Sequence, residues 1–167
     1  MKKILLTLLL AFSFIACSSK SDETANKNIE PKLVVGKSLN SLALKDQNEK
    51  PQTLSKDTKI IFFSFSKPMG HACNDFLESK PANYLQEHHA VYVADVSAAP
   101  SLIKSMFILP DLKELKFPIL LINDDTLSEE YSKGVNKDTI VVVSLENKKI
   151  TKIQTAKDAK ELETLLK

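Results

Sequence analysis

The stretch KIIFFSF, Lys59 to Phe65, decides the fold. β-Branched and aromatic residues fill it almost without interruption, which is typical of a strand buried on both faces in the middle of a sheet. Ala90 to Val96 has the same character, and Thr139 to Leu145 forms a hairpin with Lys149 to Gln154 around the turn at Glu146-Asn147. The pattern predicts Lys59 to Phe65 as the central strand, flanked by Ala90 to Val96 and Thr139 to Leu145.

Helical periodicity alternates with these strands. It predicts a helix over 73–89, broken near Pro81, a helix over 101–109 after Pro100, and a closing amphipathic helix over 158–166; 118–122 is a further short strand. This alternation predicts an α/β fold in which helices cover both faces of a mixed central sheet. The apolar residues that share one side of the helix over 101–109 are Leu102, Ile103, Met106 and Phe107.

Composition excludes some classes of function. The chain has 167 residues, of which 43% are hydrophobic and 26% charged, as expected for one globular domain. Every basic residue is lysine, and without Lys2 and Lys3 the remaining chain is neutral. Neutral charge and the absence of arginine argue against nucleic acid as a partner. The three glycines lie too far apart for a phosphate-binding glycine loop.

The first residues have the pattern of a signal peptide. Met1-Lys2-Lys3 is basic, and the apolar run Ile4 to Ile15 is too short to cross a bilayer. Phe14-Ile15-Ala16-Cys17 resembles the bacterial lipobox, which implies that Cys17 is acylated, with palmitate among its chains, and becomes the first residue of the mature protein. An ordinary secretory signal with an incidental Cys17 is the alternative.

The sequence predicts that the chain is divided into three parts. Residues 1–16 are the predicted signal peptide, 17–32 the lipidated cysteine with a flexible tether, and 33–167 the folded domain. Ser18 to Asn28 contains no apolar residue larger than alanine, so we expect it to be disordered and to span on the order of 20 Å. The predicted location is the bacterial cell envelope, with the protein anchored by lipid in the inner or outer membrane and facing the periplasm.

Several short motifs in order resemble the thioredoxin-like superfamily, in particular its peroxiredoxin-like and periplasmic reductase-like branches. They are the opening Val35-Gly36-Lys37, Phe117-Pro118-Ile119-Leu120, and Tyr131 followed by Gly134-Val135 ahead of the closing hairpin. The resemblance implies a thioredoxin-like fold over nearly all of the domain. It also implies that any catalytic cysteine lies where the central strand ends and the first helix begins.

That region holds one cysteine, Cys73, and no CxxC motif. With Cys17 assigned to lipid, exchange between two thiols of one molecule is excluded. Cys73 lies near the place of the peroxidatic cysteine of peroxiredoxins, so it is the candidate catalytic residue of a one-cysteine, thiol-dependent peroxidase. However, Gly70 stands where those enzymes have threonine or serine, and no arginine exists to lower the thiol pKa. Burial beside Phe76 and Leu77 is the competing interpretation of Cys73.

Copper binding is a second interpretation of the same region. Met69, His71 and Cys73 offer a thioether, an imidazole and a thiolate, all suited to Cu(I). The segment resembles the CxxxC of copper-delivering thioredoxin-like proteins, with methionine in place of the first cysteine. Those proteins also use a distant histidine, whereas His88 and His89 precede a strand. A histidine at a helix end and a core methionine explain the residues without metal.

Other candidates are less specific. Asp95 ends a buried strand, where α/β proteins gather functional side chains, but it could equally cap the following helix. Asp124-Asp125 and Glu129-Glu130 form an acidic segment without the ligand spacing of a calcium loop. Asp138-Thr139 stands where redox members have a cis-proline.

The sequence therefore predicts a membrane-anchored periplasmic thioredoxin-like protein without dithiol chemistry, a binding or interaction module of the cell envelope. Its expected partners are the membrane, through Cys17, and an envelope protein, and no cofactor is expected. The alternative is a peroxidase-like redox protein or a copper-handling protein that uses Met69, His71 and Cys73.

Overall fold

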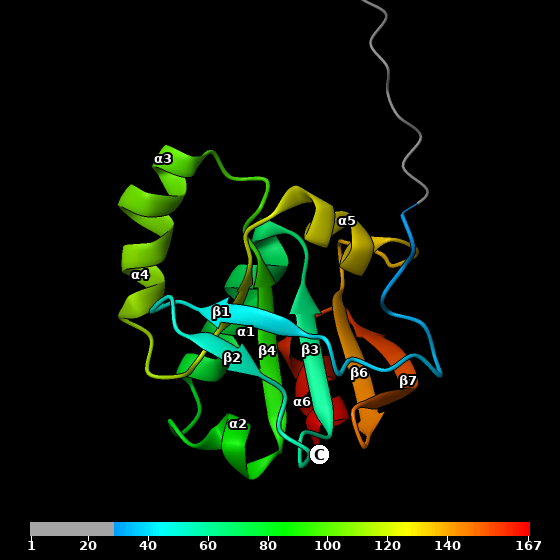
Figure 1. The fold of residues 1–167 in the computed structure, drawn as a ribbon. Helices are drawn as coiled ribbons and strands as arrows, with labels where there is room; N and C mark the ends of the chain where they lie inside the picture. Colours follow the sequence, from blue (N-terminus) through cyan, green and yellow to red (C-terminus); the bar gives the residue numbers. More distant parts are fainter. Residues whose placement is uncertain (1–28) are drawn as a thin grey trace, which may run out of the picture.

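The computed structural model describes residues 29–167, so the predictions for the signal peptide, Cys17 and Ser18 to Asn28 lie outside it. The described chain forms one seven-stranded mixed sheet with helices around it (Figure 1). In chain order the elements are β1 Ala43–Asp46, β2 Pro51–Thr53, β3 Ile60–Ser64, α1 Lys67–Glu78, α2 Tyr84–Glu87, β4 Ala90–Asp95, α3 Ser101–Ile103, a π-helical turn Lys104–Ile108, α4 Leu109–Lys113, β5 Leu120–Ile122, α5 Asp125–Ser132, β6 Ile140–Glu146, β7 Lys149–Ala156 and α6 Ala159–Leu166.

The strand order is β2-β1-β5-β4-β3-β6-β7. β3 pairs in parallel with β4 and antiparallel with β6, while β4 pairs in parallel with β5. The central strand and its two predicted neighbours are therefore confirmed. The two-residue turn between β6 and β7 places Asn147 and Lys148 at φ 48° and 63°, the left-handed region that tight hairpin turns require.

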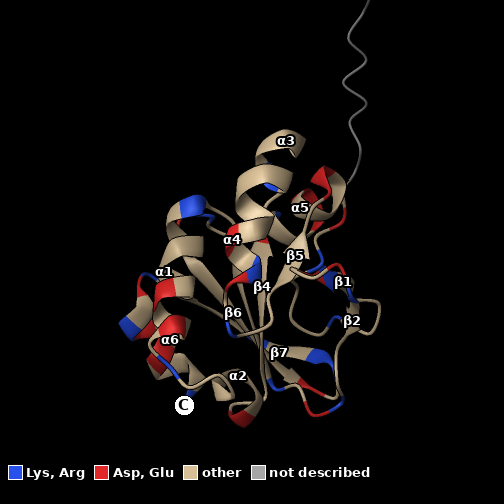
Figure 2. Cartoon of the chain, turned by 90° about the vertical axis from the view of Figure 1, so that its left-hand side faces the viewer, with Lys and Arg blue, Asp and Glu red and all other residues tan. Residues whose placement is uncertain are grey.

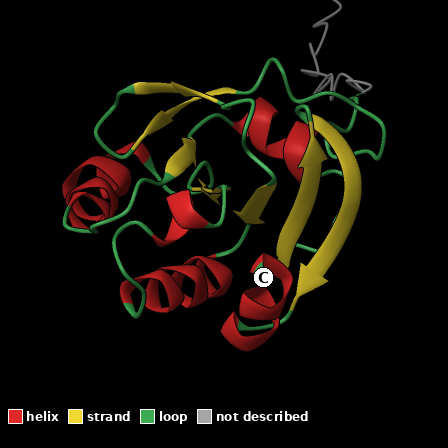
Figure 3. Ribbon diagram, turned by 90° about the horizontal axis from the view of Figure 1, so that it is seen from below, coloured by secondary structure: helices red, strands yellow, loops and turns green. Residues whose placement is uncertain are grey.

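Two apolar cores lie on opposite faces of the sheet, because alternate side chains of a strand point to opposite sides. Phe62 enters the core beneath α1, α2 and α6, whereas Ile61 and Phe63 enter the core that Tyr131 of α5 and the N-terminal segment cover. Figure 3, which views the molecule from below, shows α1 and α6 on one side of the sheet and α5 on the other. Helices on both faces confirm the predicted α/β architecture.

The helix predicted to begin at Cys73 begins six residues earlier, at Lys67, and ends at Glu78. Pro68 and Gly70 look like helix breakers in the sequence. Proline is well tolerated in a first turn, because an amide there has no partner within the helix. Residues 84–87 form the separate short helix α2 beyond Pro81, so the predicted break is present.

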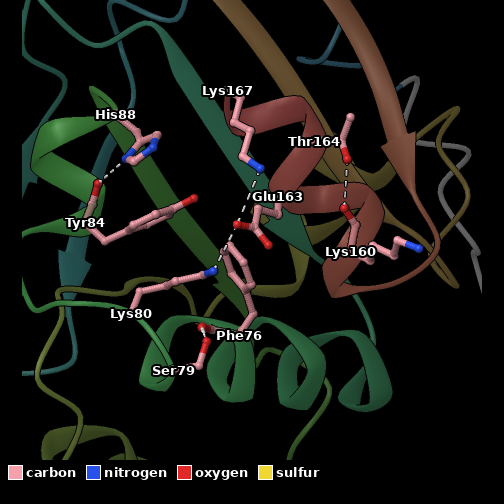
Figure 4. A network of polar contacts seen from close by, with 9 residues as sticks. All are labelled: Phe76, Ser79, Lys80, Tyr84, His88, Lys160, Glu163, Thr164 and Lys167. Carbon is pink, nitrogen blue, oxygen red and sulfur yellow. Dashed lines mark hydrogen bonds and ion pairs between the residues drawn. The ribbon is translucent and has the colours of Figure 1, made fainter.

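A lysine joins α1 to α6 across the domain surface (Figure 4). Lys80 Nζ lies 3.1 Å from Glu163 Oε1 of α6 and 4.9 Å and 5.6 Å from the ring centres of Phe76 and Tyr84. The His88 ring stacks on Tyr84, with Nδ1 2.8 Å from the Tyr84 carbonyl oxygen. His88 therefore completes the end of α2.

The turn between β1 and β2 is organised by Asp46. Its carboxylate accepts hydrogen bonds from the amides of Asn48 and Lys50, at 2.8 and 3.0 Å, and from Gln52 Nε2 at 3.0 Å. Burial by itself raises the pKa of Asp46, but these hydrogen bonds, with the charge of Lys50, outweigh it and lower the pKa. The charged carboxylate therefore stabilises the folded state.

We expect Asp46→Ala to lower the free energy of unfolding by about 2 kcal/mol at pH 7, because three hydrogen bonds to a charged acceptor are lost. Since the pKa of Asp46 is lowered on folding, its contribution is present above the unfolded value of about 4 and is lost as the pH falls through the folded value. Urea titrations between pH 2 and 7 measure both effects. A difference between variant and wild type that stays constant down to pH 2 would contradict this role.

Candidate functional site

The candidate site lies where β3 ends and α1 begins. Phe65 and Ser66 connect the two elements, and Ser66 has the extended conformation (φ −139°, ψ 154°) typical of a residue that precedes a helix. Its side chain makes no capping hydrogen bond, and its Oγ is buried without a hydrogen-bond partner among the described residues. The start of α1 therefore has no side-chain cap from its N-cap residue.

Cys73 is the seventh residue of α1 and has an exposed fraction of 0%. It belongs to the same core as Phe62, Phe76 and Leu77. Burial raises the pKa of the Cys73 thiol to about 12, although a hydrogen bond from Tyr92 partly opposes the shift. The thiol is thus protonated at neutral pH and shielded from solvent, the opposite of an activated nucleophile.

A buried polar group accompanies this thiol. Tyr92 is fully buried in β4, and its hydroxyl lies 2.9 Å from Ser64 Oγ and 3.5 Å from the carbonyl oxygen of Gly70. Burial also raises the pKa of Tyr92 well above its ordinary value. Neither Ser64 nor Tyr92 was predicted from the sequence, because their contact arises from the parallel pairing of β3 with β4.

The helix separates the three residues predicted to bind copper. Successive residues of an α-helix turn by about 100°, so His71 points to the side opposite Met69 and Cys73. His71 is exposed, Met69 is half-buried against the core, and Cys73 is fully buried. The structure therefore brings Met69 and Cys73 to one side of α1 and leaves His71 on the other.

The remaining histidines do not join this region. His89 immediately precedes β4, and His88 ends α2, so both lie at the opposite end of the parallel strands from the start of α1. Within residues 29–167, no group of three or more His, Cys, Asp or Glu side chains has the proximity needed to hold a metal ion. Copper binding remains a prediction.

Asp95, at the end of β4, connects this strand to the following loop and to α5. Its carboxylate accepts hydrogen bonds from the Ser97 amide, at 2.9 Å, and from the hydroxyl of Ser128 in α5. The helix α3 begins after Pro100, so Asp95 does not cap it directly. Of the acidic segment, Asp124 caps α5 by accepting a hydrogen bond from the Leu127 amide at 2.9 Å.

An open depression of about 490 Å³ lies at the carboxyl ends of β4 and β5. Lys104 reaches into it and donates hydrogen bonds to the carbonyl oxygens of Ser97 and Asn123, both at 3.3 Å. Ligands of α/β proteins usually bind at this end of the sheet. A second depression, of about 580 Å³, lies at the opposite end and includes His89. Neither depression was predicted from the sequence.

The comparisons with known proteins address the fold. No protein-family model matches the chain, and the search of curated proteins found no match. Among solved structures, a protein proposed to be a disulfide isomerase from Bacteroides thetaiotaomicron matches with a TM-score of 0.50 and 15% identity, covering 80% of this chain and 86% of that one. The fold is thioredoxin-like.

Two more solved structures agree with this assignment of the fold. A protein proposed to be a thioredoxin from Neisseria meningitidis has a TM-score of 0.50 and 15% identity, over 74% of this chain and 85% of that one. The exposed lipoprotein thioredoxin of Streptococcus pneumoniae has a TM-score of 0.50 and 12% identity, over 75% and 96%. The predicted resemblance is thus confirmed for the fold. In the described thioredoxin-like chain no peptide bond is cis, including the one before Thr139.

Proposed function

We propose that the chain is a lipid-anchored thioredoxin-like protein of the bacterial cell envelope that acts as a binding module and carries out no thiol redox chemistry. The observation that carries the proposal is Cys73, the only cysteine apart from Cys17, which is fully buried with its thiol pKa raised to about 12. The thioredoxin-like site therefore presents backbone and polar side chains to a partner instead of a reactive thiol.

The depression at the carboxyl ends of β4 and β5 is the binding surface we favour. It combines the Lys104 ammonium group with the carboxylates of Asp124 and Asp125. Such a mixed polar surface fits a segment of another envelope protein better than an apolar small molecule.

The anchor rests on the sequence around Cys17. Across residues 29–167 no helix has both the length and the apolar character that crossing a bilayer requires. Two or more acyl chains on one cysteine hold a protein firmly, at about 0.8 kcal/mol per buried methylene.

Complementation of a deletion strain tests the proposal. We expect wild-type protein to fractionate with membranes and Cys17→Ala to appear in the soluble fraction, because the short apolar run of the signal peptide cannot hold the protein by itself. We expect Cys73→Ser to fractionate with membranes and to restore any envelope defect as well as wild type does.

Two results would contradict the proposal. If Cys17→Ala stays in the membrane at wild-type size, the lipid anchor is wrong. If the deletion sensitises cells to peroxide or to copper and Cys73→Ser fails to restore resistance, the peroxidase or copper interpretation replaces the binding module.

A further inference from the structure

Four large apolar side chains of one surface segment face solvent. Leu102, Ile103, Met106 and Phe107 have exposed fractions of 66, 41, 58 and 56%. They occupy α3 and the π-helical turn that follows it. We call this set the α3 apolar face. Among the described residues, the other large hydrophobic side chains with comparable exposure are Val34 and Val35, which lie near the start of the described chain.

The α3 apolar face does not contribute to the hydrophobic core. The same helical segment uses Ile108, Leu109 and Leu112 to contact the core beneath α1. Figure 1 shows α3 standing clear of the sheet at the upper end of the molecule. An exposed apolar helix face of this kind often marks a surface that contacts a partner or a membrane.

The segment that forms the α3 apolar face carries little charge of its own. Between Ser97 and Pro110 the only charged residue is Lys104, although charged residues make up 26% of the chain. Figure 2 shows this helix as largely uncharged, whereas α5 beside it carries acidic residues and the helix ends and loops below carry charges of both signs. The Lys104 ammonium group is directed to the carbonyl oxygens of Ser97 and Asn123. The partner of this face is therefore apolar.

The size of the face argues against a stable dimer. Four side chains of this kind, about half exposed, present on the order of 400 Å². A stable protein interface needs about 800 Å² from each partner. An apolar surface of this size suits an occupant that is already held nearby by another attachment.

The predicted anchor supplies such an attachment. The described chain starts at Ile29, and Figures 1 and 2 both place its start at the same end of the molecule as α3. Eleven residues, Ser18 to Asn28, separate Ile29 from Cys17, and the tether predicted from their composition would span on the order of 20 Å. A bilayer that holds the acyl chains of Cys17 is then within reach of α3.

We infer that the α3 apolar face inserts shallowly into the leaflet that holds the lipid anchor and so fixes the orientation of the domain on the membrane. This inference rests on the lipid anchor of the proposed function. Because the contact is apolar, we expect it to change little between low and high salt.

An environment-sensitive fluorophore tests the inference. The full lipidated chain carries Phe107→Cys, labelled with NBD; buried Cys73 and acylated Cys17 leave this thiol as the reactive one. The matched control is Gln86→Cys, an exposed position of α2 at the opposite end of the domain. In vesicles of phosphatidylethanolamine and phosphatidylglycerol, we expect a blue shift and quenching by spin-labelled lipid at position 107 and neither effect at position 86.

Each other outcome overturns the inference in a distinguishable way. If the protein floats with vesicles but position 107 shows no shift, the anchor stands and the docking face is wrong. If the protein does not float, the proposed function fails and the inference fails with it. If the shift occurs without vesicles, grows with protein concentration and accompanies a doubled mass, a second copy covers the face instead.

Discussion

Cys73 in the folded protein is expected to react with iodoacetamide at pH 7 about a thousand-fold more slowly than in the unfolded chain. The thiolate is the reacting species, and burial raises the pKa of this thiol from an ordinary value of 9.0 to about 12. The thiolate population therefore falls by about a thousand-fold, apart from any shielding by the core. Alkylation followed by mass spectrometry in a Cys17→Ser background, with and without urea, measures the ratio.

A matched variant tests whether burial of the thiol, and not the surrounding sequence, causes the slow alkylation. His71 is exposed on the same helix turn as buried Cys73, so His71→Cys combined with Cys73→Ser moves the thiol from the core to the surface. We expect this variant to react at the rate of an ordinary thiol. Rapid alkylation of Cys73 in the folded wild type would instead identify Cys73 as a reactive thiol and a candidate catalytic residue.

The same shift makes stability depend on pH. Since the thiol pKa is raised on folding, the contribution of Cys73 to the free energy of unfolding is fully present below pH 9.0 and is lost as the pH rises toward 12. Replacement by serine, a more polar group in the same core, costs about 1 kcal/mol at pH 7. The difference in the free energy of unfolding between wild type and Cys73→Ser should therefore become smaller in alkaline solution.

The rise in the pKa of the Cys73 thiol was predictable from the sequence, because it depends on residues close to Cys73 in the chain. Phe76 and Leu77 are one turn from Cys73, and apolar residues at that spacing share the buried side of a helix. The buried hydroxyl of Tyr92 was not predictable, since it arrives from β4 through the parallel pairing of β3 and β4. Long-range pairing of this kind leaves no local signal.

In the fold, too, features that depend on local sequence were predictable, whereas features that depend on long-range contacts were not. A buried central strand shows directly in the apolar run of β3, and the hairpin of β6 and β7 shows in its turn. In contrast, the position of β1 beside β5 depends on contacts across more than seventy residues. The solvent-facing side of α3 was also unpredictable, because helical periodicity identifies an apolar side but not what covers it.

Gln47 shows how much such a long-range contact can contribute. Its side chain has an exposed fraction of 3% and follows β1 directly. Its Nε2 donates a hydrogen bond to the Phe117 carbonyl oxygen at 2.8 Å, and its Oε1 accepts one from the Ile119 amide at 2.9 Å. The side-chain amide thus continues the β1–β5 pairing where the backbone turns away.

We expect Gln47→Leu, which keeps nearly the same volume, to lower the free energy of unfolding by about 3 kcal/mol. Both partners would stay buried without hydrogen bonds, and each unsatisfied backbone group costs about 1–3 kcal/mol. A loss of this size is a large part of the 5–15 kcal/mol typical of a domain. Urea unfolding followed by circular dichroism measures it, with wild type as the reference.

Gln47→Glu tests whether hydrogen bonding or volume is responsible. A charged glutamate can still accept from the Ile119 amide, but it places an oxygen against the Phe117 carbonyl oxygen. Burial and this contact would raise the pKa of the new carboxyl group, so its protonated form, which can donate, is favoured in the folded state. A raised folded pKa means that stability is retained below the unfolded value of about 4.3 and lost as the pH rises. Relative to wild type at each pH, the glutamate variant should therefore be less destabilised at pH 4 than at pH 7, whereas Gln47→Leu should be equally destabilised at both. Equal losses for the two variants at both pH values would show that Gln47 contributes packing alone.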